Sequence, residues 1–446
     1  MKTALIKSRL IHYGLLIIIL CLILNTPLQT KGQERKPFQL PSTQVGVFKV
    51  NYFFNTQLVA RYQEMNKGTL VGADEVGRSF DVSVRRTRIN ANSQMGKVYW
   101  KVQVGFNNLN QTRNRSELRV LDAYAKWTPA DYFHIGGGKS IYYGLSRYSS
   151  LSTSSMITAE IPLTALTTIN KDDDLIRRNN VFAEGQIGKF DYNIILAKPF
   201  LSTTAGAPVL SEPKLAPDFY PTDAYQTSGY FVYRFKDNEG MGAVAPGSYL
   251  GKKKLINVGV GFMYQSNATW IKNAAGDTLK YAMLHWAADF MLDMPLDAEN
   301  DKSFTFYALF MDANYGPNYV RNVGVNSIAT GTTKDNTYNG AGNAYPGLGS
   351  GIMTYAQTAY RWRAKSWESV DAWMPYAAIN ISDYEGLDEL VAVYEYGLNV
   401  LFYGHESKLT LGFQHRPIFE TNANGKIKST GYKPLALLQY SIRLKS

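Results

Sequence analysis

Residues 97–108 read KVYWKVQVGFNN, and apolar and polar side chains alternate along most of this stretch. The side chains at even positions from Val98 to Phe106 are apolar, whereas those at odd positions from Lys97 to Asn107 are mostly polar. Successive side chains of a β-strand point to opposite faces, so the pattern predicts a strand with one apolar and one polar face. Its length of about ten residues is twice that of a typical strand and suits a tilted strand that crosses a bilayer.

The same alternation recurs along the chain from residue 45 to residue 446, in about sixteen segments. An even number of long strands is typical of a closed barrel with both termini on one side. We therefore expect an all-β fold: a single transmembrane antiparallel β-barrel domain over residues 45–446. The segments begin near Val45, Arg78, Lys97, Glu117, Tyr132, Asn179, Phe190, Tyr225, Lys254, Tyr281, Ser303, Ile352, Val370, Val391, Lys408 and Tyr432.

The connections between these segments are long and short in alternation. Residues 140–178 and 314–351 form long connections, whereas 95–96 and 188–189 form tight turns. This alternation predicts long extracellular loops and mostly short periplasmic turns. The connection over residues 237–253 breaks the rule, because it is long and glycine-rich where a short turn is expected.

Composition excludes several other classes of protein. The chain has 446 residues, of which 45% are hydrophobic, 19% are charged and one is cysteine. These values exclude a disordered chain, a disulfide scaffold and a coiled coil. After the N-terminal segment there is no run of about 18 apolar residues, which excludes a polytopic helical membrane protein.

The N-terminal segment has the layout of a secretory signal. Lys2, Lys7 and Arg9 precede an apolar stretch over residues 14–24, which is too short to span a membrane. We expect a cleaved signal peptide over residues 1–32, a short extension over 33–44, and export to the cell outer membrane. Because residues 1–32 contain four basic and no acidic residues, cleavage lowers the formal charge from +11 to +7.

In such a barrel the polar face of each strand lines the lumen, because a lysine or arginine in lipid costs about 2–4 kcal/mol near the midplane. The stretch Val84–Arg88 breaks the alternation and predicts a β-bulge that turns at least two of its arginines inward. A basic excess favours anions in a water-filled channel. In the alternative interpretation these cations pair with inward acids and only stiffen the wall. The expected pore-lining basic residues are Lys49, Arg61, Arg85, Arg86, Arg88, Lys97, Lys101, Lys126, Lys139, Arg361, Arg363 and Arg416, and the expected inward acids are Asp81, Asp122, Glu184, Asp289 and Glu395.

The connection over residues 140–178 carries no strong strand pattern and is a candidate constriction loop that folds into the pore. In this interpretation its tyrosines and arginine face the solute, with acids opposite. In the alternative it is a solvated surface loop whose acid run faces water or binds Ca²⁺ weakly. The candidate constriction residues are Tyr142, Tyr143, Arg147, Tyr148, Glu160, Asp172, Asp173 and Asp174.

We expect no catalytic residue, metal site, cofactor or nucleic-acid partner. His134, His285 and His415 lie in separate predicted strands without the spacing of metal ligands. No arrangement of Ser, His and Asp is defined by spacing either.

Three blocks in residues 79–140 resemble the phosphate-selective porin family. They are SFDVSVRRTRIN at 79–90, LDAYAKWTP at 121–129 and IGGGK at 135–139, although Ile141-Tyr142-Tyr143 stands where the family has Pro-Phe. The resemblance implies a sixteen-stranded outer-membrane porin, commonly a homotrimer, in which basic residues guide anions.

Together these observations predict a passive diffusion channel in the outer membrane for small hydrophilic solutes, with a preference for phosphate-like anions. The expected partners are outer-membrane lipid, small anionic or hydrophilic solutes, and further copies of the chain in a homotrimer. The alternatives are an outer-membrane lipid hydrolase, or an adhesin or assembly component that acts through its long loops.

Overall fold

The computed structural model describes residues 39–46, 48–113, 117–141, 144–201, 218–220, 224–240, 242, 244–333, 338–365 and 367–446. The predicted signal peptide over residues 1–32 lies outside the described residues, as does the first half of the extension over 33–44. Two candidate constriction residues, Tyr142 and Tyr143, also lie outside them.

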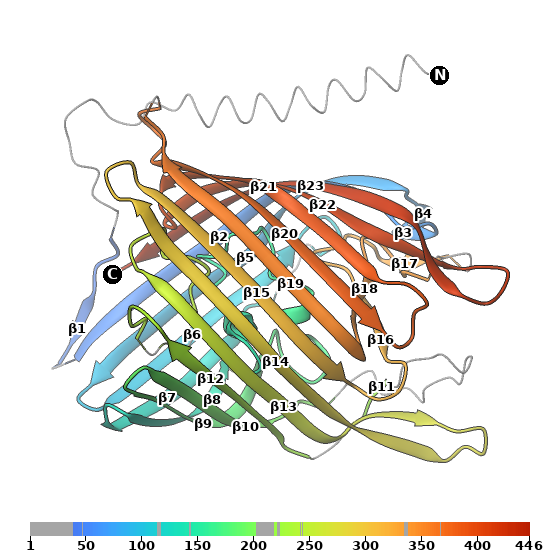
Figure 1. Ribbon diagram of the computed structural model, residues 1–446, viewed down its shortest axis with the longest axis horizontal. Coiled ribbons are helices and arrows are strands. Elements are labelled where there is room, and N and C mark those ends of the chain that lie inside the picture. Colours follow the sequence, from blue (N-terminus) through green and yellow to red (C-terminus); the bar gives the residue numbers. More distant parts are fainter. Residues whose placement is uncertain are drawn as a thin grey trace.

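Sixteen long strands form a closed antiparallel β-barrel, which confirms the predicted fold (Figure 1). Each strand pairs with the next along the chain, and β2 pairs with β23 to close the barrel, with Leu58 opposite Tyr440. The strands are β2 (Phe48–Glu64), β5 (Arg78–Met95), β6 (Val98–Leu109), β7 (Arg119–Ala130), β8 (Phe133–Ile141), β9 (Arg177–Ile187), β10 (Phe190–Lys198), β12 (Gln226–Arg234), β13 (Leu255–Lys272), β14 (Thr278–Asp297), β15 (Lys302–Asn314), β19 (Gly351–Arg363), β20 (Ala372–Tyr384), β21 (Val391–Tyr403), β22 (Ser407–Thr421) and β23 (Ile427–Lys445).

The remaining elements are short. Strand β1 pairs with β2 and β11 pairs with β13, while the others form two small sheets in the connections. In the part of the chain that the structure describes, no helix is long and apolar enough to cross a membrane. The short elements are β1 (Thr43–Val45), β3 (Thr69–Val71), β4 (Asp74–Glu75), β11 (Asp218–Phe219), β16 (Val320–Val323), β17 (Gly331–Thr332), β18 (Tyr345–Gly349) and the 3-10 helices η1 (Arg147–Ser150) and η2 (Leu163–Ala165).

The two ends of the barrel differ. One end, here the turn end, carries the C-terminus and tight turns such as residues 131–132 and 188–189. The other end, here the loop end, carries the long connections and the hairpins β13–β14 and β22–β23, which project beyond the barrel in Figure 1. Long loops at one end and mostly short turns at the other agree with the predicted architecture.

The outward face of the barrel is apolar. Val82 is 67% exposed and Trp286 is 46% exposed, although both lie within long strands. Near the turn end, Trp127 and Tyr132 are also exposed. Because amphipathic rings favour the membrane–water interface, this face suits lipid, with an aromatic girdle at the turn end.

The inward face is not polar on every strand, and here the sequence-based expectation is wrong. The wall formed by β13, β14, β15 and β19 carries buried methionines at inward positions, because another part of the chain covers this wall and removes it from water. We call this the methionine wall, and its methionines are Met263, Met283, Met291, Met311 and Met353.

Residues 144–176 form the covering layer, which we call the inward segment. It lies inside the barrel and packs against the methionine wall. The ring of Tyr148 stacks on that of Tyr307, with centroids 3.8 Å apart, and the Tyr315 hydroxyl donates a hydrogen bond of 2.8 Å to the carbonyl oxygen of Thr167. Such burial of large aromatic rings favours this position strongly over a solvated surface loop.

The described residues of the long connection between β12 and β13 (235–240, 242 and 244–254) also enter the barrel, but from the turn end. We call this connection the inward turn. It meets the inward segment at Ala245, whose carbonyl oxygen accepts a hydrogen bond from Ser152 N (2.8 Å) and whose N–H donates to Ser150 O (2.9 Å). The irregular connection in the sequence is therefore an elaborated turn, and no strand lies among its described residues.

Candidate functional site

A β-bulge on β5 sets the geometry of the arginine cluster. On β2, Gln57 pairs with Arg86 and Leu58 pairs with Val84, so Arg85 has no residue opposite it. This extra residue shifts the alternation by one position. As a result Arg85, Arg86 and also Arg88 are all buried inside the barrel, and the predicted bulge is confirmed.

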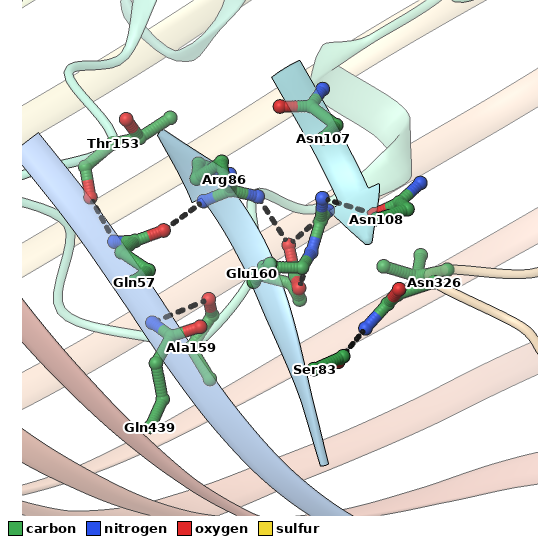
Figure 2. A network of polar contacts seen from close by, with 12 residues as sticks. Gln57, Ser83, Arg86, Asn107, Asn108, Thr153, Ala159, Glu160, Asn326 and Gln439 are labelled. Carbon is green, nitrogen blue, oxygen red and sulfur yellow. Dashed lines mark hydrogen bonds and ion pairs between the residues drawn. The ribbon is translucent and has the colours of Figure 1, made fainter. Parts of the chain in front are cut away.

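Arg85 and Arg86 hold the carboxylate of Glu160, which the inward segment carries across the lumen (Figure 2). Arg85 Nη2 and Arg86 Nη2 each lie 2.7 Å from Glu160 Oε2, and Arg85 Nε contacts Oε1. Amide oxygens orient both guanidinium groups, since Arg86 Nη1 donates to Gln57 Oε1 (2.9 Å) and Arg85 Nη1 donates to Asn108 Oδ1 (2.8 Å).

The charge state of Glu160 follows from these contacts. Burial raises the pKa of Glu160, but the charges of Arg85 and Arg86 and their hydrogen bonds outweigh burial and lower the pKa to about 2. Glu160 is therefore ionised at neutral pH. The group of two guanidinium cations and one carboxylate carries a net charge of +1.

The same ratio of two cations to one carboxylate recurs at three other places along the lumen. At each place the carboxylate lies between two basic side chains. Pairing leaves one positive charge at Asp122 and at Glu406, whereas at Asp174 a second carboxylate, that of Glu117, 3.8 Å from Arg119, balances the charge. Burial raises the pKa of Asp174, but its two cations lower it below the usual range. The nitrogen–oxygen distances are 3.0 Å and 3.1 Å for Lys101 and Arg177 with Asp122, 2.7 Å and 3.1 Å for Lys139 and Arg119 with Asp174, and 2.7 Å and 3.4 Å for Arg443 and Lys445 with Glu406.

Not every predicted pore-lining cation serves the same role. Arg61 donates to the carbonyl oxygens of Val325 and Asn326, so it anchors the β15–β19 connection at the loop end. Arg416 is fully buried and donates to Asn66 Oδ1 at 2.8 Å, which fixes the β2–β5 connection.

Four other predicted cations lie at the turn end. Arg361 and Arg363 both contact Asp301, in the turn between β14 and β15. Lys97 donates to Pro129 O, and Lys49 is exposed.

Of the remaining predicted cations, Lys126 forms an ion pair with a single carboxylate, that of Glu184, at 2.8 Å.

The candidate constriction acids fold back on basic residues of the barrel. Asp172 and Asp173 both contact the fully buried guanidinium of Arg178 on β9. Asp173 Oδ1 also accepts hydrogen bonds from the backbone N–H groups of Asn170 and Ile176, both at 2.9 Å. These contacts fasten the end of the inward segment to the wall, and they differ from those expected of a solvated acid run.

The remaining candidate constriction residues connect the inward segment to the inward turn and the barrel. Arg147 forms a bidentate ion pair with Glu239 of the inward turn, with distances of 2.8 Å and 2.6 Å. The sequence did not identify Glu239, and the only signal for it was the unexpected length of residues 237–253.

Two aspartates on β14 hold both inward elements. Asp289 Oδ2 accepts hydrogen bonds from the backbone N–H of Arg147 (2.7 Å) and from the hydroxyl of Tyr307 (3.0 Å). Asp293 Oδ2 accepts one from the backbone N–H of Tyr249 in the inward turn. One strand thus fixes the inward segment and the inward turn through carboxylate–amide hydrogen bonds, which are stronger than neutral ones.

We expect Asp289→Ala to lower the free energy of unfolding, because it leaves buried donors of Arg147 and Tyr307 without an acceptor. Each such donor costs about 1–3 kcal/mol. The measurement is urea unfolding of the micelle-refolded protein, followed by tryptophan fluorescence. Asp277→Ala is the control, since Asp277 lies in an exposed hairpin tip where a substitution costs at most about 0.5 kcal/mol. Equal unfolding midpoints for the two variants would contradict this role of Asp289.

A cavity of about 1300 Å³ extends from the turn end between the inward segment and the wall formed by β2, β5, β6 and β7. A second cavity of about 60 Å³ lies beyond it, lined by Glu160, Arg61 and Tyr345, and Ile161 lines both. The large cavity is lined by the basic side chains Arg88, Lys101, Lys126, Arg177, Lys252, Arg443 and Lys445 and by the carboxylate side chains Asp122, Asp131 and Glu406.

Several solved structures resemble this fold. They include an anion-selective porin from Comamonas acidovorans (9% identity, covering 90% of this chain and 100% of that chain, TM-score 0.49). Others are the outer membrane channel DcaP of Acinetobacter baumannii (13%, 90% and 100%, TM-score 0.47) and the trimer form of OmpT, an outer membrane protein of Vibrio cholerae (10%, 89% and 99%, TM-score 0.48). These values are too low to transfer a function.

No protein-family model and no curated protein sequence matches the chain. Membership of the phosphate-selective porin family, suggested by residues 79–140, therefore stays a prediction.

Proposed function

We propose that this protein is an outer-membrane porin, a passive diffusion channel for small hydrophilic solutes that prefers anions. In this proposal the turn end faces the periplasm and the loop end faces the medium, residues 1–32 are removed on export, and the barrel assembles as a homotrimer in outer-membrane lipid. Solutes pass along the large cavity, between the inward segment and the wall of β2, β5, β6 and β7.

The observation that carries this proposal is the charge left after ion pairing. Seven lysine and arginine side chains and three carboxylate side chains line the large cavity. Because Asp122 and Glu406 are each shared by two cations, pairing does not cancel the positive charge. A single net charge about 7 Å from a permeating ion contributes about 0.6 kcal/mol even in bulk water, and more at lower dielectric.

Anions of the phosphate type suit such a site, because guanidinium groups bind oxyanions through paired hydrogen bonds. Arg88 is the best-placed member of the arginine cluster. It lines the large cavity and donates its hydrogen bonds to the neutral oxygens of Thr87, Phe106 and Asn107. Its charge therefore remains available to a solute.

The test is the reversal potential of the purified full chain in a planar bilayer under a tenfold KCl gradient. We expect the sign that indicates chloride preference, with an anion-to-cation permeability ratio of about 2–10, since 1.4 kcal/mol corresponds to a factor of ten. A reversal potential of the cationic sign would contradict anion preference. Absence of any conductance would contradict the channel itself.

A further inference from the structure

The wall of the large cavity carries a row of side-chain amides beside the cations. Asn92 Nδ2 donates to Asn90 Oδ1 (3.2 Å), and Asn90 Nδ2 donates to Gln103 Oε1 (3.3 Å). Asn55 lines the same cavity, and its buried Oδ1 has no hydrogen-bond partner among the described residues. The wall thus offers acceptor oxygens as well as donors.

The strand register places these amides directly beside charge. Asn90 is opposite Gln103 and Gln103 is opposite Asp122, so the amides adjoin the carboxylate that Lys101 and Arg177 share. Directly opposed residues on neighbouring strands have Cβ atoms about 5 Å apart. Amides and a net positive charge therefore form one continuous patch.

Aromatic rings complete the patch. Tyr124 is opposite Lys101, and its ring lies 6.1 Å from that of Tyr99, tilted by 48°. Both tyrosines line the large cavity, and Lys126 Nζ lies 5.9 Å from the centroid of the Tyr99 ring. Ring faces of this kind provide rigid, amphipathic contact area for the apolar C–H face of a ligand.

These three kinds of group indicate the chemistry of the ligand. A small inorganic anion needs only donors and positive charge, and it has no use for the acceptor oxygens of amides. Hydroxyl groups need both donors and acceptors. A ligand that satisfies the whole patch carries several hydroxyl groups, an apolar C–H face and one negative charge.

We propose that the patch formed by Asn55, Asn90, Gln103, Tyr124 and the Lys101–Asp122–Arg177 group is a binding site for a polyhydroxylated anion, a sugar acid or a sugar phosphate. This inference deepens the proposed function and rests on it, since it names the class of solute that the channel favours.

The first experiment measures block of the chloride current of the full chain in planar bilayers. The probes are gluconate and glucose 6-phosphate, compared with acetate and inorganic phosphate, which lack the hydroxylated chain, and with sorbitol, which lacks charge. We expect at least one hydroxylated anion to block at an at least tenfold lower concentration than every comparison compound. Block with this tenfold advantage, by gluconate or by glucose 6-phosphate, supports the site and identifies the charged group that it prefers. Equal potency of all five compounds would overturn it.

The second experiment removes the amides while keeping the side-chain shape. Asn90→Leu and Gln103→Met are expected to abolish the tenfold advantage of the hydroxylated anion over its comparison compound. Asn380→Leu is the matched control, because Asn380 is a buried amide of β20 outside the cavity lining, and we expect it to retain the advantage. Heat-modifiable mobility on gels establishes that each variant is a folded barrel. An advantage that survives both amide substitutions would overturn the assignment.

Calorimetric titration of the micelle-solubilised protein with gluconate and with glucose 6-phosphate separates failure of this inference from failure of the proposed function. Binding without any bilayer conductance would support the site and reject the channel. Anion-selective conductance, with neither compound binding more tightly than acetate or inorganic phosphate, would reject the site and leave the channel intact.

Discussion

Removing the inward segment is expected to raise single-channel conductance about 3- to 10-fold, since a sixteen-stranded barrel without a covering layer encloses a water-filled channel. The barrel offers a simple way to make this variant. Ile141 at the end of β8 is directly opposite Arg177 at the start of β9, so a two-residue Asn-Gly turn can join the strands. Conductance in KCl is the measurement.

The control shortens a connection that lies outside the lumen. Residues 273–277 join β13 to β14 at the tip of a projecting hairpin, and replacing them with Asn-Gly is expected to leave conductance unchanged. Equal conductance of the inward-segment deletion and the unaltered chain would mean that the solute path does not pass this segment. We also expect the deletion to lower stability, because it exposes the methionine wall to water.

The strand pattern could be predicted from sequence because it arises locally. Each long strand separates an apolar outward face from an inward face, and this contrast repeats every two residues. The predicted starts at Arg78, Phe190 and Val391 coincide with the observed ones. The break in alternation near Arg85 also marked the bulge correctly, since one inserted residue shifts every later side chain to the other face.

The contents of the lumen could not be predicted in the same way. The methionine wall could not be predicted, because an apolar side chain on the inward face is expected only where another segment covers it, and that cover comes from a distant part of the chain. Glu160 meets Arg85 across 75 positions of sequence, and no local pattern encodes such a pairing. The sequence placed Asp289 on the inward face, but its partners on the inward segment depend on how that segment crosses the barrel.

Two interpretations of the inward cations remained open: they guide solutes, or they only pair with acids. The ion pairs support a part of each. Most of them are paired, so they do stabilise the wall. Yet the carboxylates of Glu160, Asp122 and Glu406 are each shared by two cations, and the arrangement keeps a positive charge at each place. A count of basic and acidic residues along the chain gives the excess of positive charge, but it does not show where ion pairing leaves that charge.

Replacing Arg85, Arg86 and Arg88 together with Gln is expected to shift the reversal potential toward cations and to lower the anion-to-cation permeability ratio about tenfold. The substitution removes three positive charges and leaves Glu160 without the two cations that lower its pKa. Arg88→Gln alone should produce a large share of the shift, because Arg88 lines the large cavity whereas the other two arginines hold Glu160.

Glu160→Gln changes the net charge of the same cluster in the opposite direction. It removes the carboxylate that Arg85 and Arg86 share, so their group changes from a net charge of +1 to +2, and we expect a stronger preference for chloride. Arg363→Gln is the control, since its side chain is 52% exposed at the turn end, and it should leave the reversal potential unchanged. If neither the triple arginine variant nor Glu160→Gln moved the reversal potential, the cluster would be structural, because a charge that permeating ions sense must shift selectivity in the direction of its sign.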